Sequence, residues 1–210
     1  MFGFIKKSVT KLLNGKEYNG EPEYNPYSYI AEEEDTNKLL KSWISVILDG
    51  AKRKSFNEEK ISLVNFIEEI IECWTPLMKK KCITIEKEVP KDLYINIPRI
   101  ELNSIFNNFF LNSADFLTDT NNKEKKISIK IVKSNKIGNI DIYLENNGPK
   151  LDEKYKDNPD RVFEMGETTK GEEGTGLGLW IMREMVQENS GEIHIMDKED
   201  GFGIKISIPS

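Results

Sequence analysis

The sequence predicts one globular α/β domain, and three observations carry that prediction. Apolar residues recur at helical spacing in some segments and alternate with polar residues in shorter ones, which is typical of helices interleaved with strands. The chain has 210 residues, 38% hydrophobic and 31% charged, which is enough apolar material to bury one core. A glycine-rich stretch at residues 161–180 (RVFEMGETTKGEEGTGLGLW) leads into one of the predicted helices.

Composition excludes several classes of function. A net charge of −6 and a pI of about 5.1 argue against nonspecific nucleic-acid binding, which needs a basic surface. No apolar run reaches membrane-spanning length, and no signal peptide is visible. Cys73 and Cys82 form no CxxC pair and His194 is the only histidine. We therefore expect reduced thiols in a cytoplasmic protein.

The N-terminal quarter is predicted to be an extension of the domain. Residues 14–35 are rich in glycine, proline, tyrosine and glutamate and form a linker. A helix with an apolar stripe is expected to follow at residues 36–48. We therefore expect a helical extension and linker over 1–55 and the domain itself over 56–210.

The domain begins with a helix, two strands and a second helix. Ser62 is a good N-cap residue for the first helix, and Pro76 is expected to weaken its end. Strands are predicted at residues 83–89 and 93–97, and Pro98 starts the second helix. The apolar stripe of the first helix is Leu63, Phe66, Ile67, Ile70, Ile71, Trp74, Leu77 and Met78.

The second helix, IELNSIFNNFFLNSADFL, combines a buried stripe with a polar face. Asn108, Asn112 and Asp115 lie at positions i, i+4 and i+7 and so share one side. Asparagine is a mediocre helix former, so two of them one turn apart indicate a polar ligand. Mg²⁺ with a triphosphate is such a ligand, because Mg²⁺ takes oxygen donors such as amide carbonyls. The alternative is that both asparagines simply face water.

Two strands and a polar segment come next. Residues 127–132 and 140–144 alternate in the manner of strands, and the second strand runs into a turn at Asn147-Gly148. The segment from Pro149 to Glu173 is charge-rich with little to bury, which fits a lid.

The chain is predicted to close with a helix from Leu177 and a hairpin of residues 191–195 and 202–208. His194 alternates with Ile193 and Ile195, so we expect an exposed structural residue in a strand.

The glycine-rich stretch predicts a phosphate site. Glycines before a helix permit positive φ and let an anion approach the unpaired N–H groups of the helix start, where the helix dipole favours negative charge. Residues 168–170 (TTK) add hydroxyl donors and a cation. Leu179 stands where a dinucleotide fingerprint needs its third glycine, and Glu172 follows Gly171 where a P-loop needs lysine. The alternative is a helix entry whose glycines serve only close packing.

Taken in order, these motifs closely resemble the boxes of sensor histidine kinases, within the GHKL superfamily of gyrases, heat-shock chaperones, histidine kinases and mismatch-repair ATPases. The N box matches NNFFLNSAD, the first glycine box ENNGPKL, the F box Phe163 to Lys170, and the second glycine box GTGLGL. The resemblance covers residues from about 60 to 210. It implies a two-layer α/β sandwich, with a mixed, mostly antiparallel sheet, helices on one face and a mobile ATP lid.

The resemblance also implies ATP and Mg²⁺ as ligands. It makes Asn112 the metal ligand and Asn108, Asn112 and Lys170 the catalytic set. The implied nucleotide-binding residues are Asn112, Asp115, Phe116, Asn146, Gly148, Phe163, Thr168, Thr169, Lys170, Gly174, Thr175, Gly176, Leu177 and Gly178.

Three positions in these boxes determine what the resemblance implies for ATP hydrolysis and nucleotide binding. Asn108 stands where the superfamily's hydrolases carry a glutamate base, and an amide cannot take a proton from water, so phosphoryl transfer is expected rather than fast hydrolysis. Asn146 replaces the aspartate that accepts the adenine amino hydrogen, which predicts weaker binding. Lys150 replaces the second glycine of its box, so the backbone is expected to approach the ligand less closely.

The implied function is that of a histidine-kinase catalytic domain in phosphorelay signalling. No H box is present, so the phosphoryl acceptor is expected to be a protein or domain on another chain. Residues 36–53 are a candidate homodimer segment, and neither nucleic acid nor a membrane span is expected. Two alternatives stay open: an anti-sigma-type serine kinase, and a nucleotide-gated interaction module with slow ATP hydrolysis.

Overall fold

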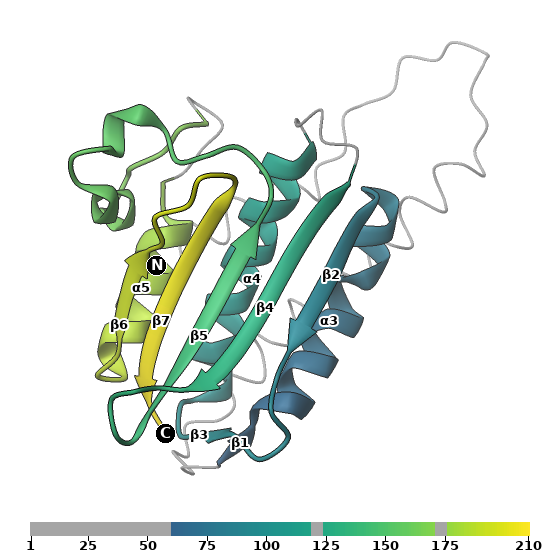
Figure 1. The fold of residues 1–210 in the computed structure, drawn as a ribbon, viewed down its shortest axis with the longest axis vertical. Coiled ribbons are helices and arrows are strands. Elements are labelled where there is room, and N and C mark those ends of the chain that lie inside the picture. Colours follow the sequence, from purple (N-terminus) through teal and green to yellow (C-terminus); the bar gives the residue numbers. More distant parts are fainter. Residues whose placement is uncertain (1–59, 119–123, 171–175) are drawn as a thin grey trace, which may run out of the picture. The chain divides into compact units, whose positions relative to one another are not determined.

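A five-stranded sheet forms the centre of the structure, a computed structural model that describes residues 60–118, 124–170 and 176–210 (Figure 1). The predicted extension over 1–55, with its helix and candidate dimer segment, lies outside these residues. The strands run in the order β2-β4-β5-β7-β6. Their bounds are Ile83–Glu88 (β2), Lys125–Lys133 (β4), Asn139–Asn146 (β5), Glu192–Ile195 (β6) and Phe202–Pro209 (β7).

Three helices cover one face of this sheet: α3 (Leu63–Lys80), α4 (Arg99–Thr118) and α5 (Gly178–Glu188), all behind the strands in Figure 1. β2 pairs with β4 in parallel, whereas the other three strand pairs are antiparallel. A parallel pair requires a long crossover, and here α4 lies within the connection between β2 and β4. The predicted two-layer sandwich with a mixed, mostly antiparallel sheet is therefore confirmed.

The core lies between the sheet and the helices. Alternate strand residues such as Ile129, Ile142 and Ile206 are buried against the helices. The Trp74 ring of α3 stacks on Phe110 of α4 with ring centroids 5.4 Å apart. Because each large apolar side chain that is fully buried contributes about 1.5–3 kcal/mol, this aromatic layer fixes α4 firmly against α3.

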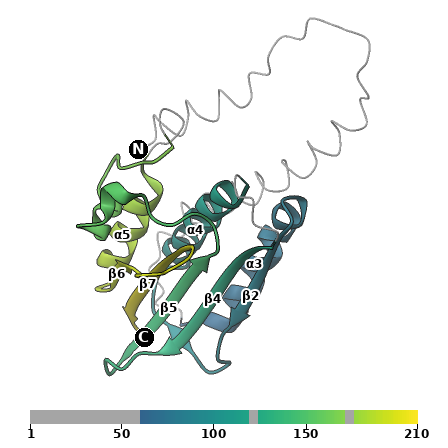
Figure 2. The same cartoon turned by 45° about the horizontal axis from the view of Figure 1, so that its top comes forward.

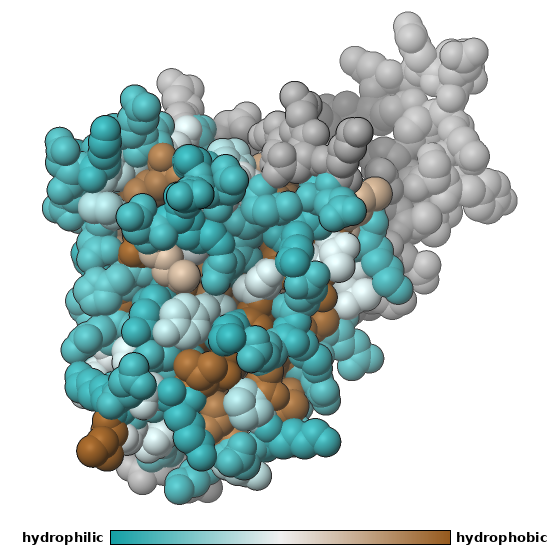
Figure 3. Space-filling model, in the orientation of Figure 1, coloured by the Kyte–Doolittle hydropathy of each residue, from teal (hydrophilic) through white to brown (hydrophobic). Residues whose placement is uncertain are grey.

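The other face of the sheet is open in the described part of the chain and is mainly hydrophilic (Figure 3). Cross-strand ion pairs run over it. The Lys126 ammonium lies 2.6 Å from the Glu86 carboxylate, and the Lys130 ammonium lies 2.9 Å from Glu88. This alternation of apolar and charged residues is the reason why the strands could be predicted from the sequence.

The start of the domain differs in detail from the prediction. The segment expected to form a strand at 93–97 is reduced to β3 (Tyr94–Ile95), which pairs with β1 (Ile61–Ser62) outside the main sheet. Ser62 precedes α3 as predicted, but its hydroxyl makes no capping hydrogen bond. α3 continues through Pro76 for a further turn, to Lys80.

The expectation that residues 149–173 have little to bury is wrong for the first part of that segment. Two 3-10 helices form there, η1 (Glu153–Tyr155) and η2 (Pro159–Phe163). They bury Tyr155, Val162 and Phe163. η2 contacts α5 and β6, and Figure 2 shows the chain leaving β5 and crossing toward α5. Three apolar residues within a charged segment were enough to anchor it.

Candidate functional site

The polar face of α4 meets the beginning of α5. A Cβ atom placed on Gly178, the first residue of α5, would lie 3.2 Å from Asn108 Oδ1 and 3.4 Å from Asn112 Nδ2. Leu177 is the N-cap residue of α5, and its apolar side chain makes no capping hydrogen bond. The start of α5, with its positive dipole end, therefore faces two side-chain amides of α4.

The asparagines of α4 have different partners. Asn108 Nδ2 donates to the Ser104 carbonyl oxygen at 2.8 Å, one turn back on the same helix. Asn107 was not singled out from the sequence, and its Oδ1 accepts a hydrogen bond from the buried Trp74 Nε1 at 2.9 Å. Asn107 and Asn108 are thus partly explained by these contacts, whereas Asn112 faces a charged group.

That charged group is the Lys170 ammonium. Its Nζ lies 2.6 Å from Asp115 Oδ2 and 3.5 Å from Asn112 Oδ1. It also lies 5.1 Å from the centroid of the Phe116 ring, within range of a cation–π interaction. The Lys170 backbone N–H donates to Thr168 Oγ1 at 3.1 Å. Three residues of α4 therefore surround the cation that a distant motif supplies.

The turn after β5 is held from several sides. Asn146 Nδ2 donates to Ser113 Oγ of α4 at 3.0 Å, and Asn146 Oδ1 accepts from Gly148 N at 3.0 Å. Asn146 is only 4% exposed. Its amide oxygen retains a second lone pair, but one is already used within the turn. Ser113, fully buried on the apolar stripe of α4, was missed from the sequence; a polar residue on that stripe was the available signal.

Asn147 fixes the same turn to β4. Its Oδ1 accepts from Lys126 N at 2.7 Å, and its Nδ2 donates to the Glu124 carbonyl oxygen at 2.7 Å. Gly201 has φ +78°, and a Cβ there would lie 2.2 Å from the Asn146 carbonyl oxygen, so only glycine fits. The turn is therefore clamped between the start of β4 and the loop before β7.

The segment that carries Thr168 and Lys170 is anchored by one carboxylate. Glu167 accepts from the Tyr155 hydroxyl at 2.9 Å and from Arg161 at 3.0 Å. Lys154 lies 3.4 Å from Glu167 and donates to the Thr168 carbonyl oxygen at 3.0 Å. These four residues, which we call the lid base (Lys154, Tyr155, Arg161 and Glu167), were not predicted, because their partners are set by η1 and η2.

These contacts shift the pKa values of the lid base. The hydrogen bond from the Tyr155 hydroxyl, followed by those from Lys154 and Arg161, holds the pKa of Glu167 below its usual value. Burial, together with Glu167, raises the pKa of the Tyr155 hydroxyl. Glu167 therefore stays ionised and Tyr155 stays protonated near neutral pH.

Two glycines close the glycine-rich loop. Gly166 N donates to the Gly176 carbonyl oxygen at 3.1 Å. Gly176 has φ +62°, and a Cβ there would lie 2.3 Å from the Gly166 carbonyl carbon. Phe163 is buried and supports this region from η2. Gly174 and Thr175 lie outside the described residues, and Thr169 makes no hydrogen bond to any residue that the structure describes.

His194 lies exposed in β6, as predicted, but the prediction missed its partner. One carboxylate oxygen of Asp160, on η2, lies 2.8 Å from His194 Nδ1. The other accepts a hydrogen bond from Ile195 N at 3.1 Å. Asp160 thus ties η2 to the edge strand of the sheet.

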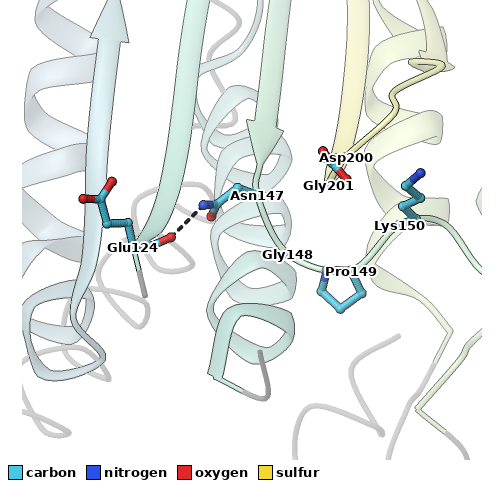
Figure 4. Close-up of a pocket in the computed structure, with 7 residues that line it drawn as sticks. All are labelled: Glu124, Asn147, Gly148, Pro149, Lys150, Asp200 and Gly201. Carbon is cyan, nitrogen blue, oxygen red and sulfur yellow. Dashed lines mark hydrogen bonds between the residues drawn. The ribbon is translucent and has the colours of Figure 1, made fainter. Parts of the chain in front are cut away.

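A polar pocket of about 780 Å³ lies beside the clamped turn (Figure 4). Of the residues predicted to bind nucleotide, it contains only Gly148. Lys150, which replaces a glycine of the resembled box, lines it. The full lining is Glu124, Asn147, Gly148, Pro149, Lys150, Asp200 and Gly201. The pocket is therefore adjacent to the cluster around Lys170 rather than part of it.

The donor set around Lys170 fits Mg²⁺ carried by a polyphosphate. Within the described residues, no group of three or more His, Cys, Asp and Glu side chains could hold a metal alone. Mg²⁺ commonly uses one or two protein oxygens together with substrate phosphates. The Asn112 and Asp115 oxygens, which already share one cation, supply such a pair.

No helix in the described part of the chain is long and apolar enough to cross a membrane.

Comparison with known proteins places these features in a family. Residues 98–210 match the family described as histidine kinase-, DNA gyrase B-, and HSP90-like ATPase. The sensor histidine kinase WalK of Bacillus subtilis (strain 168) is 27% identical over 186 residues, which make up 84% of this chain and 28% of WalK. The chain therefore spans less than a third of that relative's length.

Solved structures of similar fold include histidine kinase domains. The catalytic domain of ThkA superposes with a TM-score of 0.60 at 24% identity, over 73% of this chain and 96% of that domain. ThkA in complex with the response regulator protein TrrA gives a TM-score of 0.61 at 21% identity, over 98% of this chain and 57% of the ThkA chain. Because the family match covers more than half of the sequence, this chain belongs to the histidine kinase-, DNA gyrase B- and HSP90-like ATPases.

Proposed function

We propose that residues 60–210 bind Mg-ATP and act as the catalytic domain of a histidine kinase, transferring the γ-phosphoryl group to an acceptor on another chain. The observation that carries the proposal is the cluster formed by Asn112, Asp115, Lys170 and the first turn of α5. Oxygen donors, a mobile cation and a helix N-terminus are the parts that a metal-bound triphosphate requires.

Each part of the cluster has a separate role. Asn112 and Asp115 hold the metal, which neutralises phosphate charge when bound. Lys170 and the N–H groups of α5 bind the phosphate oxygens. Asn146 offers adenine the remaining lone pair of its amide oxygen, without a charge and from a nearly buried position. Affinity for adenine is therefore expected to be lower than an aspartate would give.

Asn108 makes transfer to water slow. Its amide cannot accept a proton, and its N–H₂ group already donates to the Ser104 carbonyl oxygen. Steady ATP hydrolysis should therefore be slow even with saturating Mg-ATP. This property separates the proposed kinase from a dedicated ATPase.

The acceptor is a partner, because the chain's single histidine is unsuited to the role. His194 lies in β6 and is tied to Asp160. It would have to leave the β6–β7 ladder to reach a phosphate held near Lys170. The complex of ThkA with the response regulator TrrA makes a response-regulator-like protein a reasonable candidate partner. Dimerisation through residues 36–53 and residence in the cytoplasm, where Cys73 and Cys82 stay without a disulfide, complete the proposal.

Calorimetry with ATP and Mg²⁺ tests the binding step. We expect Asn112→Ala to abolish the Mg-dependent part of the affinity while leaving the thermal unfolding midpoint nearly unchanged. Asn65→Ala is the matched control, because Asn65 is an exposed asparagine on α3. Unchanged Mg-ATP affinity in Asn112→Ala would refute the metal-ligand assignment.

Incubation with γ-labelled ATP tests the transfer step. The chain alone should show neither self-labelling nor rapid phosphate release, and a genuine partner should gain an acid-labile phosphoryl group. An acid-stable product would indicate a serine kinase instead. ATP-dependent association without any transfer would indicate an interaction module. Strong self-labelling that disappears in His194→Ala would contradict the assigned role of His194.

A further inference from the structure

The position of Lys170 beside α4 indicates how metal binding is coupled to residues 168–170. Its ammonium occupies a point between Asp115 Oδ2, at 2.6 Å, and Asn112 Oδ1, at 3.5 Å. Both oxygens come from one face of α4, three residues apart, so the rigid helix sets their spacing. A cation is thus already bound where the proposed metal ligands converge.

An ammonium and a divalent metal compete for the side-chain oxygens of Asn112 and Asp115. Carboxylate and amide oxygens are the ligands that Mg²⁺ prefers, and the same oxygens accept hydrogen bonds from a lysine. One Asp115 oxygen cannot serve both cations at full strength, because the two positive charges would repel each other.

We propose that Lys170 is a built-in occupant of the cation site formed by Asn112 and Asp115, and that Mg²⁺ arriving with the triphosphate displaces it. This inference rests on the proposed function of the same site. Once displaced, Lys170 is free to pair with phosphate oxygens. Its departure also releases residues 168–170 from α4, so the arrival of the metal and the movement of this segment are one event.

The exchange makes Asp115 the residue that sets the requirement for Mg²⁺. Without metal, its carboxylate repels a triphosphate, and Lys170 must neutralise either the carboxylate or the phosphates. With metal, the carboxylate becomes a ligand and Lys170 is available to the phosphates. The ratio of the ATP dissociation constant in EDTA to that in Mg²⁺ therefore reports on the exchange.

A different change in this ratio is expected if the Lys170–Asp115 pair is only a structural tether. The pair is partly exposed, with side-chain exposures of 29% for Lys170 and 55% for Asp115. If it served only to hold residues 168–170 against α4, removing either partner would free the segment equally. Both substitutions would then move the ratio in the same direction, or leave it unchanged.

The test measures this ratio by calorimetry for the full chain and its variants. Lys170→Met should raise the ratio, because Mg²⁺ no longer has to displace an ammonium, whereas metal-free ATP meets an unpaired carboxylate. Asp115→Asn should lower the ratio, because a metal ligand and a repulsion are both removed. Each change should be at least about threefold, which lies within the range for ion pairs of this exposure. The double variant should resemble Asp115→Asn.

Lys130→Met is the matched control, since Lys130 pairs with Glu88 at 2.9 Å on the open sheet face. It should leave the ratio unchanged. Lys170→Gln and Asp115→Ser repeat the comparison with different side chains, in case one variant folds poorly. Equal or absent shifts in variants that still bind Mg-ATP would overturn the exchange and leave the proposed function intact. Failure of the unaltered chain to bind ATP would overturn the proposed function itself.

Discussion

α4 and the lid base both position residues of the candidate site, but by different forces. α4 places Asn112 and Asp115 from a helix whose opposite side is packed into the aromatic core. The lid base places Thr168 and Lys170 through hydrogen bonds and ion pairs that converge on Glu167. Apolar packing involves no titrating group and no charge to be screened, whereas partly exposed charged contacts respond to both pH and salt. The side of the site formed by α4 is therefore fixed, whereas the side formed by Thr168 and Lys170 can be released.

This difference suits a site that must admit and release a ligand. Local opening has the lowest free energy where few apolar groups are buried. Tyr155, Val162 and Phe163 give the lid segment a small buried anchor, and the residues that follow depend on polar contacts. Movement is thus expected beyond Phe163, with η1 and η2 remaining in place.

The largest expected effect on stability comes from disrupting the aromatic packing between α3 and α4. Phe110→Ala removes a fully buried ring that stacks on Trp74, and substitutions of this kind cost about 3–5 kcal/mol. We expect the free energy of unfolding in urea to fall by that amount and α4 to lose its fixed position. A loss below about 1 kcal/mol would show that α4 is held by something other than this core.

The next effect is local strain at the glycine contact. Gly176→Ala would place a Cβ 2.3 Å from the Gly166 carbonyl carbon at φ +62°. Strain at one residue is of order 1–3 kcal/mol, so we expect the Gly166–Gly176 contact to open and the Gly166 amide to exchange faster with solvent.

Gly138→Ala is the matched control for that prediction. Gly138 also has positive φ, +82°, but a Cβ there meets nothing within 4 Å. It should leave the exchange of the Gly166 amide unchanged. Equal effects of the two substitutions on exchange of the Gly166 amide would show that the close approach at Gly176 is not the cause.

A smaller effect is expected from pH at the lid base. Glu167 has a folded-state pKa below its usual value of 4.5, so its contribution is fully present above about pH 4.5 and is lost as the pH falls through the folded pKa. Hydrogen exchange over residues 164–168 should be constant near neutral pH and should accelerate in acid, before the rest of the domain unfolds.

Glu167→Gln should remove that acid step and accelerate exchange at neutral pH. Glu164→Gln is the control, because Glu164 is exposed and lies 4.0 Å from Arg161. Retention of the acid step in Glu167→Gln would identify a different titrating group.

The smallest effect tests the open sheet face. Lys130→Met breaks an exposed ion pair with Glu88, and surface substitutions of this kind usually stay within about 0.5 kcal/mol. Unfolding in urea should barely change. A loss comparable to that of Phe110→Ala would mean that the charged ladder, and not the core, supports the sheet.

The fold and the residue types of the site could be predicted because they depend on short-range patterns. Alternation of apolar and polar residues predicted β4, β5 and β7, and helical periodicity of apolar residues predicted α3, α4 and α5. The spacing of Asn108, Asn112 and Asp115 placed them on one side of α4. The glycines predicted the helix start that α5 forms, and a Cβ on its first residue, Gly178, would lie 3.4 Å from Asn112 Nδ2.

The partners of these residues could not be predicted. Ser113 bonds Asn146 and Asn107 bonds Trp74, in each case across 33 residues of sequence. The lid base was missed because Tyr155 and Glu167 meet only after η1 and η2 have turned the chain back on itself. No local pattern encodes such a meeting.

By itself, therefore, the sequence determined which side chains are available and on which face of which element each one lies, since periodicity is a property of neighbouring residues. The tertiary structure alone decided that Lys170 occupies the oxygens of Asn112 and Asp115. That contact joins residues 55 and 58 positions apart, and its geometry follows from how α4 packs on the sheet and how the lid base holds the segment after η2. The attraction between two charges depends on their distance in space, and only packing brings distant parts of the chain within a few ångströms.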